Sequence, residues 1–179
     1  MSVFAFAMYS GSYSLRGRMM DDPIGFFLTW ATYGTWLPGD SRGWIEYRKG
    51  WHLPDPARES EAKFYMSEDA CWLTPAQRSA VEKQIAETCS IRGWNLHAVN
   101  CRSNHIHIVV SAINTAPKKI RGDLKAWARC LKENFDKNRD HWWAERGSIR
   151  YINDDDSLEA AIIYVRDAQD FRKDDSGLR

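Results

Sequence analysis

The chain has 179 residues, of which 44% are hydrophobic and 27% charged, and its formal net charge is +1. These proportions are those of an ordinary globular protein and exclude a disordered, collagen-like or membrane-spanning chain. The four cysteines form no C-x-x-C pair, which argues against a cysteine zinc site and favours a reducing, cytoplasmic compartment. We expect one domain over residues 23–172, with a poorly ordered tail at 1–22 and a short tail at 173–179.

The first half of the chain predicts one strand and one long connection. Residues 26–33 form an apolar and aromatic run that ends in turn residues, which indicates a buried strand. Residues 40–70 contain Pro54, Pro56 and an acidic stretch, and we expect them to form a loop.

The middle of the chain predicts a helix followed by a hairpin. Thr74 and Pro75 are typical of a helix cap and a first helical residue, and the helix should end near Gly93. Residues 94–99 and 105–111 predict two strands, because a short polar turn separates two apolar runs.

The last third predicts a helix over 118–138, a short strand over 149–152 and a final helix that is capped at Asp156 and Ser157. The order is then strand, helix, strand, strand, helix, strand and an extra helix. This order is typical of an α+β fold, the ferredoxin-like split βαβ sandwich. The expected architecture is an antiparallel sheet with helices on one face plus a C-terminal helix.

Two histidines, His105 and His107, lie in the second strand of the hairpin directly after Asn104. Side chains of a strand alternate between its faces, so both imidazoles project on the same face. Two neutral imidazoles at this spacing can share one divalent cation. The alternative is a half-buried strand whose polar face holds two histidines and no metal, and the H-x-H spacing alone favours that alternative.

The helix predicted over 118–138 carries basic and apolar residues on separate faces, because each set recurs at helical spacing. A basic stripe of this kind can follow the phosphates of a nucleic acid, and the alternative is a solvated face. The basic residues are Lys118, Arg121, Lys125, Arg129 and Lys132. The apolar residues are Ile120, Leu124, Trp127, Leu131 and Phe135.

The last helix carries Tyr164 at the margin of its apolar face. Taken alone, this residue is a tyrosine at the edge of the core. Its interpretation changes if the helix packs beside the strand that carries the histidines.

An H-hydrophobic-H strand, an Asn before it and one Tyr on a C-terminal helix together resemble the single-tyrosine HUH transposases. These are the small IS200-like insertion-sequence transposases and their REP-associated relatives in bacteria. The resemblance covers about residues 26–169, and three segments in the family's order carry it. They are FFLTWATYGTWLPGDSRGW, WNLHAVNCRSNHIHIVV, and GSIRYI followed by AAIIYVRDAQ.

The resemblance implies that His105 and His107 hold a Mg²⁺ or Mn²⁺ ion that polarises a scissile phosphate of single-stranded DNA. It implies that Tyr164 attacks the phosphorus and leaves a 5′-phosphotyrosine and a free 3′-hydroxyl. Relatives place Gln or Asn four residues after the Tyr, where this chain has Ala168. Gln169 is then the implied third ligand, and Asp167 is the alternative because it shares the face of Tyr164 better.

The resemblance also implies a partner, single-stranded DNA with hairpin structure, and a bacterial, nucleoid-associated protein with no membrane contact. Family members include dimers and monomers, and the sequence leaves both open. The alternative function is a domesticated, non-catalytic module that binds single-stranded nucleic acid on the same fold. The implied phosphate contacts are Lys118, Arg121, Lys125 and Arg129. The candidates for stacking on bases are Trp36, Trp44, Trp142 and Trp143.

Overall fold

A computed structural model describes residues 22–46, 48–126 and 128–167 of the chain. A four-stranded sheet in the order β4-β5-β1-β6 lies at its centre, and every neighbouring pair is antiparallel. The expected fold class, a ferredoxin-like α+β sandwich, is confirmed. The strands are β1 (Gly25–Ala31), β4 (Asn95–Cys101), β5 (His105–Ser111) and β6 (Ser148–Ile152).

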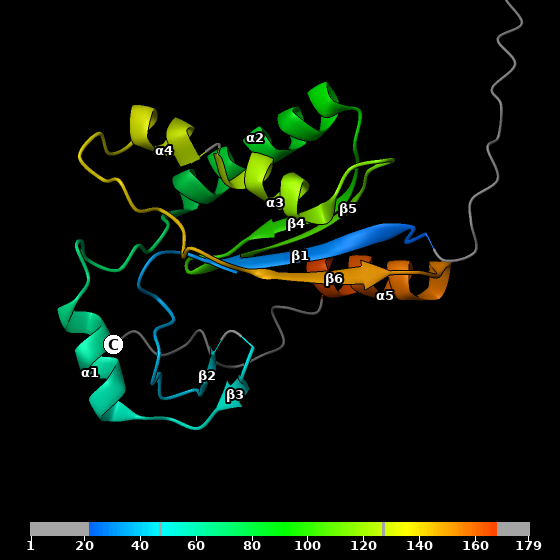
Figure 1. The fold of residues 1–179 in the computed structure, drawn as a ribbon. Coiled ribbons are helices and arrows are strands. Elements are labelled where there is room, and N and C mark those ends of the chain that lie inside the picture. Colours follow the sequence, from blue (N-terminus) through cyan, green and yellow to red (C-terminus); the bar gives the residue numbers. More distant parts are fainter. Residues whose placement is uncertain (1–21, 47, 127, 168–179) are drawn as a thin grey trace, which may run out of the picture.

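Helices cover the two faces of this sheet unequally (Figure 1). One face is covered by α2 (Pro75–Arg92), α3 (Pro117–Ala126) and α4 (Ala128–Asn134). The opposite face carries α5 (Asp155–Arg166), which contacts β4 and β5. No helix of the described residues is long and apolar enough to cross a bilayer.

The main core lies between the sheet and the helices α2, α3 and α4. The strands present alternate residues to it, because successive side chains of a strand point to opposite faces. A smaller apolar cluster lies on the other face, under α5. The strand residues of the main core include Phe26, Leu28, Trp30, Ile106, Ile108 and Val110. The smaller cluster is built on Ala98, Val109, Ile152 and Val165.

The boundaries of α2 confirm the prediction from its capping residues. The Thr74 side chain accepts a hydrogen bond from the backbone of Gln77, and the Gln77 side chain accepts one from the backbone of Thr74. This reciprocal capping box satisfies two backbone donors at the start of the helix. Gly93 ends the helix with φ of 67°, a left-handed conformation that glycine adopts without steric cost.

The expectation of a loop over 40–70 is wrong, because this segment contains β2 (Trp44–Glu46), β3 (Gly50–His52) and α1 (Pro56–Phe64). We call residues 34–70 the insertion; it lies on the same side of the sheet as α5 (Figure 1). Its strands have only three residues each, and α1 has no buried residue. Neither feature produces the hydrophobic periodicity by which elements are found in a sequence.

The insertion has a small aromatic centre of its own around Trp44. The Trp44 ring stacks on His52 with centroids 4.5 Å apart, and the Arg58 guanidinium lies 4.6 Å from its centroid. Trp44 and Trp142 are buried, so the prediction that these two stack on bases is wrong. Trp143 packs edge-on against Trp30 at the core, whereas Trp36 is 42% exposed.

Two helix boundaries differ from the prediction. The helix expected over 118–138 ends earlier, at Asn134; its described parts are α3 and α4, on either side of residue 127, which lies outside the described residues. The last helix is capped by Asp154, whose side chain accepts from the backbone of Ser157, and not by Asp156 or Ser157. Several adjacent acidic residues can cap a helix, so the sequence alone did not identify the one that does.

Gly147 provides a test of how tightly β6 packs against β1. A Cβ atom at this position would lie 2.5 Å from the Thr29 carbonyl oxygen and 2.8 Å from the Trp30 Cβ. We expect Gly147→Ala to lower the free energy of unfolding by about 1–3 kcal/mol, the usual cost of overpacking. Gly122→Ala is the control, because a Cβ there meets nothing within 4 Å. Urea unfolding should show the loss for Gly147→Ala alone.

Candidate active site on the sheet face under α5

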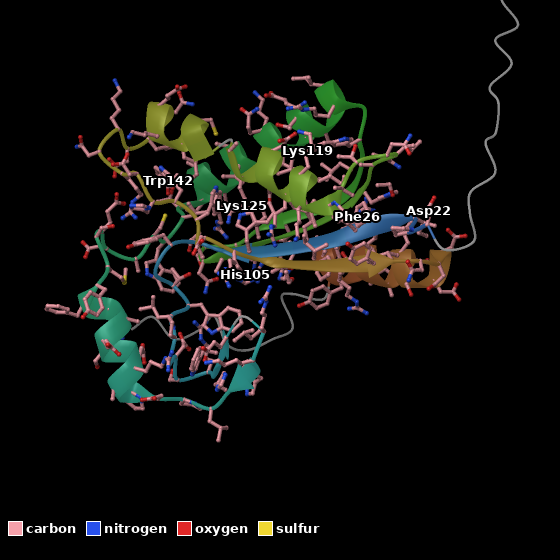
Figure 2. The ribbon with its side chains drawn as sticks, viewed as in Figure 1. Asp22, Phe26, His105, Lys119, Lys125 and Trp142 are labelled. Carbon is pink, nitrogen blue, oxygen red and sulfur yellow. The ribbon has the colours of Figure 1, made fainter. Side chains whose placement is uncertain are left out.

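The two histidines of β5 lie side by side on the sheet face that α5 partly covers. In the register with β1, His105 pairs with Ala31 and His107 pairs with Thr29. The two imidazole centroids are 4.8 Å apart, with an angle of 76° between the rings. Figure 2 shows His105 on the side of the sheet away from Lys119 and Lys125 of α3.

The environment of His107 favours its neutral form. The side chain is buried, with 9% exposure. Burial, together with the neighbouring His105 and Arg102, lowers the pKa of His107 to about 4. The imidazole is therefore neutral near pH 7, which is the form that coordinates a metal ion.

Tyr164 approaches the histidines because α5 is fixed to β4. The Asn100 side chain donates to the Val165 carbonyl at 3.0 Å, and Arg166 donates to the His97 carbonyl at 2.8 Å. The ring centroid of Tyr164 lies 5.6 Å from that of His107, with an angle of 80° between the rings. The structure therefore brings together the three side chains that the sequence proposed for catalysis.

Two residues that the sequence analysis did not identify complete this cluster. Phe27 stacks on His107 with centroids 5.4 Å apart and contacts Tyr164 edge-on at 5.9 Å. The Thr29 Oγ1 lies 2.8 Å from the Nδ1 of His107. Phe27 and Thr29 alternate with core residues of β1, so their shared face was predictable. Their contacts with His107 depend on a strand register between residues almost 80 positions apart, for which the sequence carries no signal.

The third metal ligand lies at the limit of the described residues. Gln169, the implied ligand, lies outside them, whereas Asp167 is the exposed C-cap residue of α5. Within residues 22–46, 48–126 and 128–167, no three His, Cys, Asp or Glu side chains form a metal-binding group. The candidate ligands that the structure places side by side are the imidazoles of His105 and His107.

The basic residues of α3 and α4 are in different environments. Arg121 donates to the Gly147 carbonyl. The Lys125 Nζ lies 2.5 Å, 3.0 Å and 3.2 Å from the carbonyl oxygens of residues 144, 145 and 146. Lys118 is exposed, and the side chain of Arg129 lies outside the described residues. Arg121 and Lys125 thus hold the segment that leads into β6, a role that helical spacing does not predict.

The contacts of Lys125 predict a stability effect with a defined pH dependence. We expect Lys125→Met to lower the free energy of unfolding by about 1–2 kcal/mol, because a charged donor to three carbonyl oxygens is lost. Lys118→Met, in the same helix, should change it little. Burial lowers the pKa of Lys125 to about 8. The folded protein therefore releases this proton at lower pH than the unfolded chain, and stability rises between about pH 8 and 10.5.

Urea unfolding at pH 7 and pH 9.5 tests both parts of this prediction. The stability of the wild type should rise relative to that of Lys125→Met between the two pH values, since all other titrating groups are common to both. A constant difference between the two proteins would show that Lys125 does not titrate in this window. An unchanged stability at pH 7 would show that the three carbonyl contacts contribute nothing.

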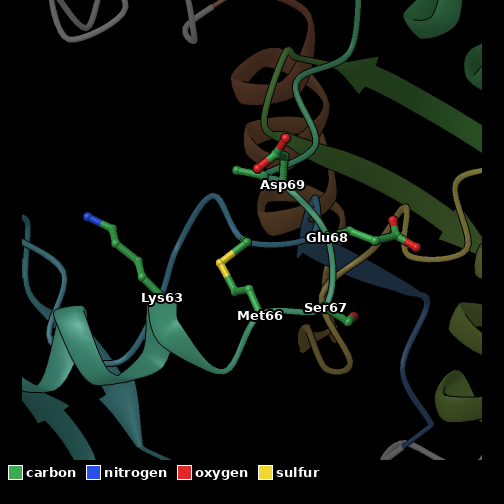
Figure 3. A pocket seen from close by; sticks show the side chains of 7 residues that line it. Lys63, Met66, Ser67, Glu68 and Asp69 are labelled. Atoms are coloured by element: carbon green, nitrogen blue, oxygen red, sulfur yellow. The ribbon is translucent and has the colours of Figure 1, made fainter.

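An open depression of about 540 Å³ lies at the base of the insertion (Figure 3). Lys63, Glu68 and Asp69 are among its lining residues, and none of the three proposed catalytic residues is. The Glu68 carboxylate accepts hydrogen bonds from the backbone of residues 140 and 141. It also forms an ion pair with Arg139 at 3.4 Å. These contacts join the insertion to the segment before β6, so the Glu68 carboxylate has a structural role.

Comparison with known proteins identifies the class of the chain. The sequence model of the IS200-like transposases matches residues 68–168, more than half of the chain, and this chain belongs to that family. DNA transposition is thus its class of activity. The match includes the histidines and Tyr164 and confirms the family resemblance found in the sequence. No curated protein sequence matches the chain.

Two solved structures are similar to this chain. The crystal structure of a transposase-like protein from Deinococcus radiodurans has a TM-score of 0.51 and 13% identity, over 84% of this chain and 94% of that one. A REP-associated tyrosine transposase bound to a REP hairpin has a TM-score of 0.48 and 10% identity, over 83% of this chain and 68% of that one. At this identity, the first comparison supports the fold alone.

Proposed function

We propose that the chain is a metal-dependent transposase that nicks single-stranded DNA beside hairpins and rejoins it through a 5′-phosphotyrosine. The observation that carries the proposal is the convergence of His105, His107 and Tyr164 on one face of the sheet. They come from two elements more than 50 residues apart, and membership of the IS200-like family gives this convergence its chemical interpretation.

The donor set fits a divalent cation. His105 and His107 supply two imidazoles on one strand face, and burial keeps His107 neutral. The remaining ligands would be oxygens, from Gln169 or Asp167 and from the DNA phosphate. When bound, Mg²⁺ or Mn²⁺ would supply Lewis-acid polarisation of the scissile phosphate.

The chemical steps follow from the tyrosine hydroxyl. The Tyr164 oxygen attacks the phosphorus, and the proton of its hydroxyl passes to solvent water. The bond from phosphorus to the 3′ oxygen breaks, and that oxygen takes a proton to become a free 3′-hydroxyl. The phosphate stays on Tyr164 as a 5′-phosphotyrosine, so the energy of the broken bond is conserved and a second 3′-hydroxyl can reverse the step.

The basic stripe is proposed to contact the DNA phosphates through Lys118, Arg121, Lys125 and Arg129. Lys118 supports this role best, because it is exposed. Arg121 and Lys125 already donate to backbone carbonyls, so their contribution to DNA binding would include the positioning of residues 144–147. Trp36, the exposed member of the four tryptophans named above, is the proposed stacking residue.

A covalent-adduct assay tests the proposed function. The full chain is incubated with Mn²⁺ and labelled, hairpin-forming single-stranded oligonucleotides taken from the DNA on either side of its own gene. We expect a protein–DNA adduct that survives SDS, appears with a free 3′-hydroxyl and is prevented by EDTA. Tight binding of these oligonucleotides without an adduct would favour the alternative, a non-catalytic single-stranded DNA-binding module.

A further inference from the structure

The imidazole of His107 is held from two sides by β1. Thr29 pairs with His107 across the strands, and its Oγ1 lies 2.8 Å from the ring Nδ1. Phe27, two residues earlier on the same face, stacks on the ring at an interplanar angle of 12°. The hydrogen bond determines which edge of the ring faces β1, and the stacking determines its plane.

The imidazole of His105 has a corresponding partner in the residue before it. The Oδ1 of Asn104 lies 2.6 Å from the Nδ1 of His105. A carboxamide oxygen only accepts hydrogen bonds, so this contact places a proton on Nδ1. Each imidazole thus has an oxygen partner at the same ring nitrogen, although the partners come from different segments.

Asn104 is itself fixed by two buried threonines at the end of β1. Its carbonyl oxygen accepts hydrogen bonds from the Thr32 backbone at 2.8 Å and the Thr32 hydroxyl at 3.1 Å. The Thr35 hydroxyl is a third donor at 3.2 Å. Thr32 and Thr35 are buried, with 0% and 7% exposure, and their hydroxyls are 3.0 Å apart. The strand β1 and the residues directly after it therefore fix both His107, through Thr29, and Asn104, which holds His105.

The position of the proton decides which ring nitrogen can bind a metal ion. A neutral imidazole has one N–H and one nitrogen lone pair, and only the lone pair coordinates a metal. A partner that accepts the Nδ1 proton places the lone pair on Nε2 and orients the ring. A hydroxyl that donated to Nδ1 would instead place the proton on Nε2 and prevent coordination there.

We propose that Thr29 and Asn104 are positioning residues that hold His107 and His105 in the tautomer protonated at Nδ1, so that Nε2 is the metal-binding atom of both. The inference rests on the proposed function, because it takes the two histidines to be metal ligands. It adds two residues to the site and assigns the buried Thr32 and Thr35 the role of fixing Asn104.

The first test measures the tautomers in the metal-free protein. Long-range ¹H–¹⁵N correlation spectra of the full chain near pH 7.5 should show both rings protonated at Nδ1, with assignments from single His→Ala variants. Thr29→Val, which removes the hydroxyl but keeps the shape, should shift His107 toward the Nε2-protonated form and leave His105 unchanged. Asn104→Ala should shift His105 toward the Nε2-protonated form and leave His107 unchanged. Thr29→Ser should restore the wild-type spectrum of His107.

The control is Thr115→Val, which removes a loop hydroxyl whose partner is the Ile113 carbonyl. Its imidazole spectrum should match that of the wild type. A His107 ring protonated at Nε2 in the wild-type protein would overturn the proposal for Thr29. A His107 spectrum unchanged in a folded Thr29→Val variant would also overturn it.

The second test measures Mn²⁺ affinity, through the electron paramagnetic resonance signal of the free ion. Thr29→Val and Asn104→Ala should each weaken binding by roughly 10–100-fold, the usual effect of losing an outer partner of a ligand. Thr29→Ser and Thr115→Val should bind as the wild type does. Affinities unchanged in Thr29→Val and Asn104→Ala would contradict the positioning roles. A wild-type chain that binds no Mn²⁺ would contradict the proposed metal site, and the tautomer spectra would still decide the positioning roles.

Discussion

Replacing Tyr164 with phenylalanine should abolish the covalent protein–DNA adduct and reduce strand cleavage by on the order of 10⁴-fold or more, as expected when a nucleophile is removed. The variant keeps the aromatic ring, so the edge-on contacts with Phe27 and His107 remain. Its free energy of unfolding and its affinity for hairpin DNA should therefore stay close to those of the wild type. The measurement is an SDS gel of the adduct together with a quantified single-turnover cleavage rate.

Tyr151→Phe is the matched control for this prediction. Tyr151 lies on β6, is 57% exposed and contacts Phe26, whose side chain belongs to the core on the opposite face of the sheet. Its replacement should leave cleavage unchanged. Mass spectrometry of the wild-type adduct should find the nucleotide on the peptide that contains Tyr164. A nucleotide on Tyr33 or Tyr151, or an adduct that persists in Tyr164→Phe, would contradict the assignment.

The parts of the fold that the sequence predicted are those whose signals are local. Thr74, Pro75 and Gly93 determined the ends of α2 because capping depends on residues within one helical turn. The position of His105 and His107 on one face of β5 is also a local signal, because side chains two residues apart in a strand point to the same face. Such signals need no knowledge of the tertiary structure.

The insertion was missed because its elements are short and exposed. The helix α1 is capped by Asp55 and begins at Pro56, which is a normal helix start. It buries no residue, so it lacks the apolar stripe that distinguishes a helix from a polar loop. The strands β2 and β3 have three residues each, too few for an alternating pattern.

The sequence predicted only part of the site. The other contacts depend on the register between strands and on how the helices and loops pack against each other. The hydrogen bond between Thr29 and His107 exists only when β1 and β5 pair with these residues opposite each other. The basic stripe shows the same limit. Helical spacing placed Arg121 and Lys125 on one face. It did not predict that backbone carbonyl oxygens of residues 144–147 accept hydrogen bonds from both side chains, because that contact depends on the tertiary structure.

The metal role of the histidines gives the second large expected effect. Replacing His107 with alanine should abolish Mn²⁺ binding and DNA cleavage while hairpin binding persists. Its loss of affinity should exceed the ~10–100-fold expected for an outer partner such as Thr29, because the ligand itself is removed. The buried ring also stacks on Phe27, so alanine leaves a cavity and lowers stability. His107→Gln, which fills more of that space, should show the same loss of metal binding with a smaller loss of stability.

His97→Gln separates this effect from the general loss of a half-buried imidazole. His97 lies on β4, its Nε2 is 2.8 Å from the Ser111 hydroxyl, and burial also lowers its pKa. Because its ring nitrogen is hydrogen-bonded to Ser111 and His97 is not a proposed ligand, its replacement should leave Mn²⁺ affinity and cleavage unchanged. Free Mn²⁺ measured by electron paramagnetic resonance and cleavage of the labelled hairpin oligonucleotide give the two readouts. Cleavage by His107→Ala in the presence of EDTA at the wild-type rate would contradict the metal role, since the reaction would then need neither the ion nor its ligand.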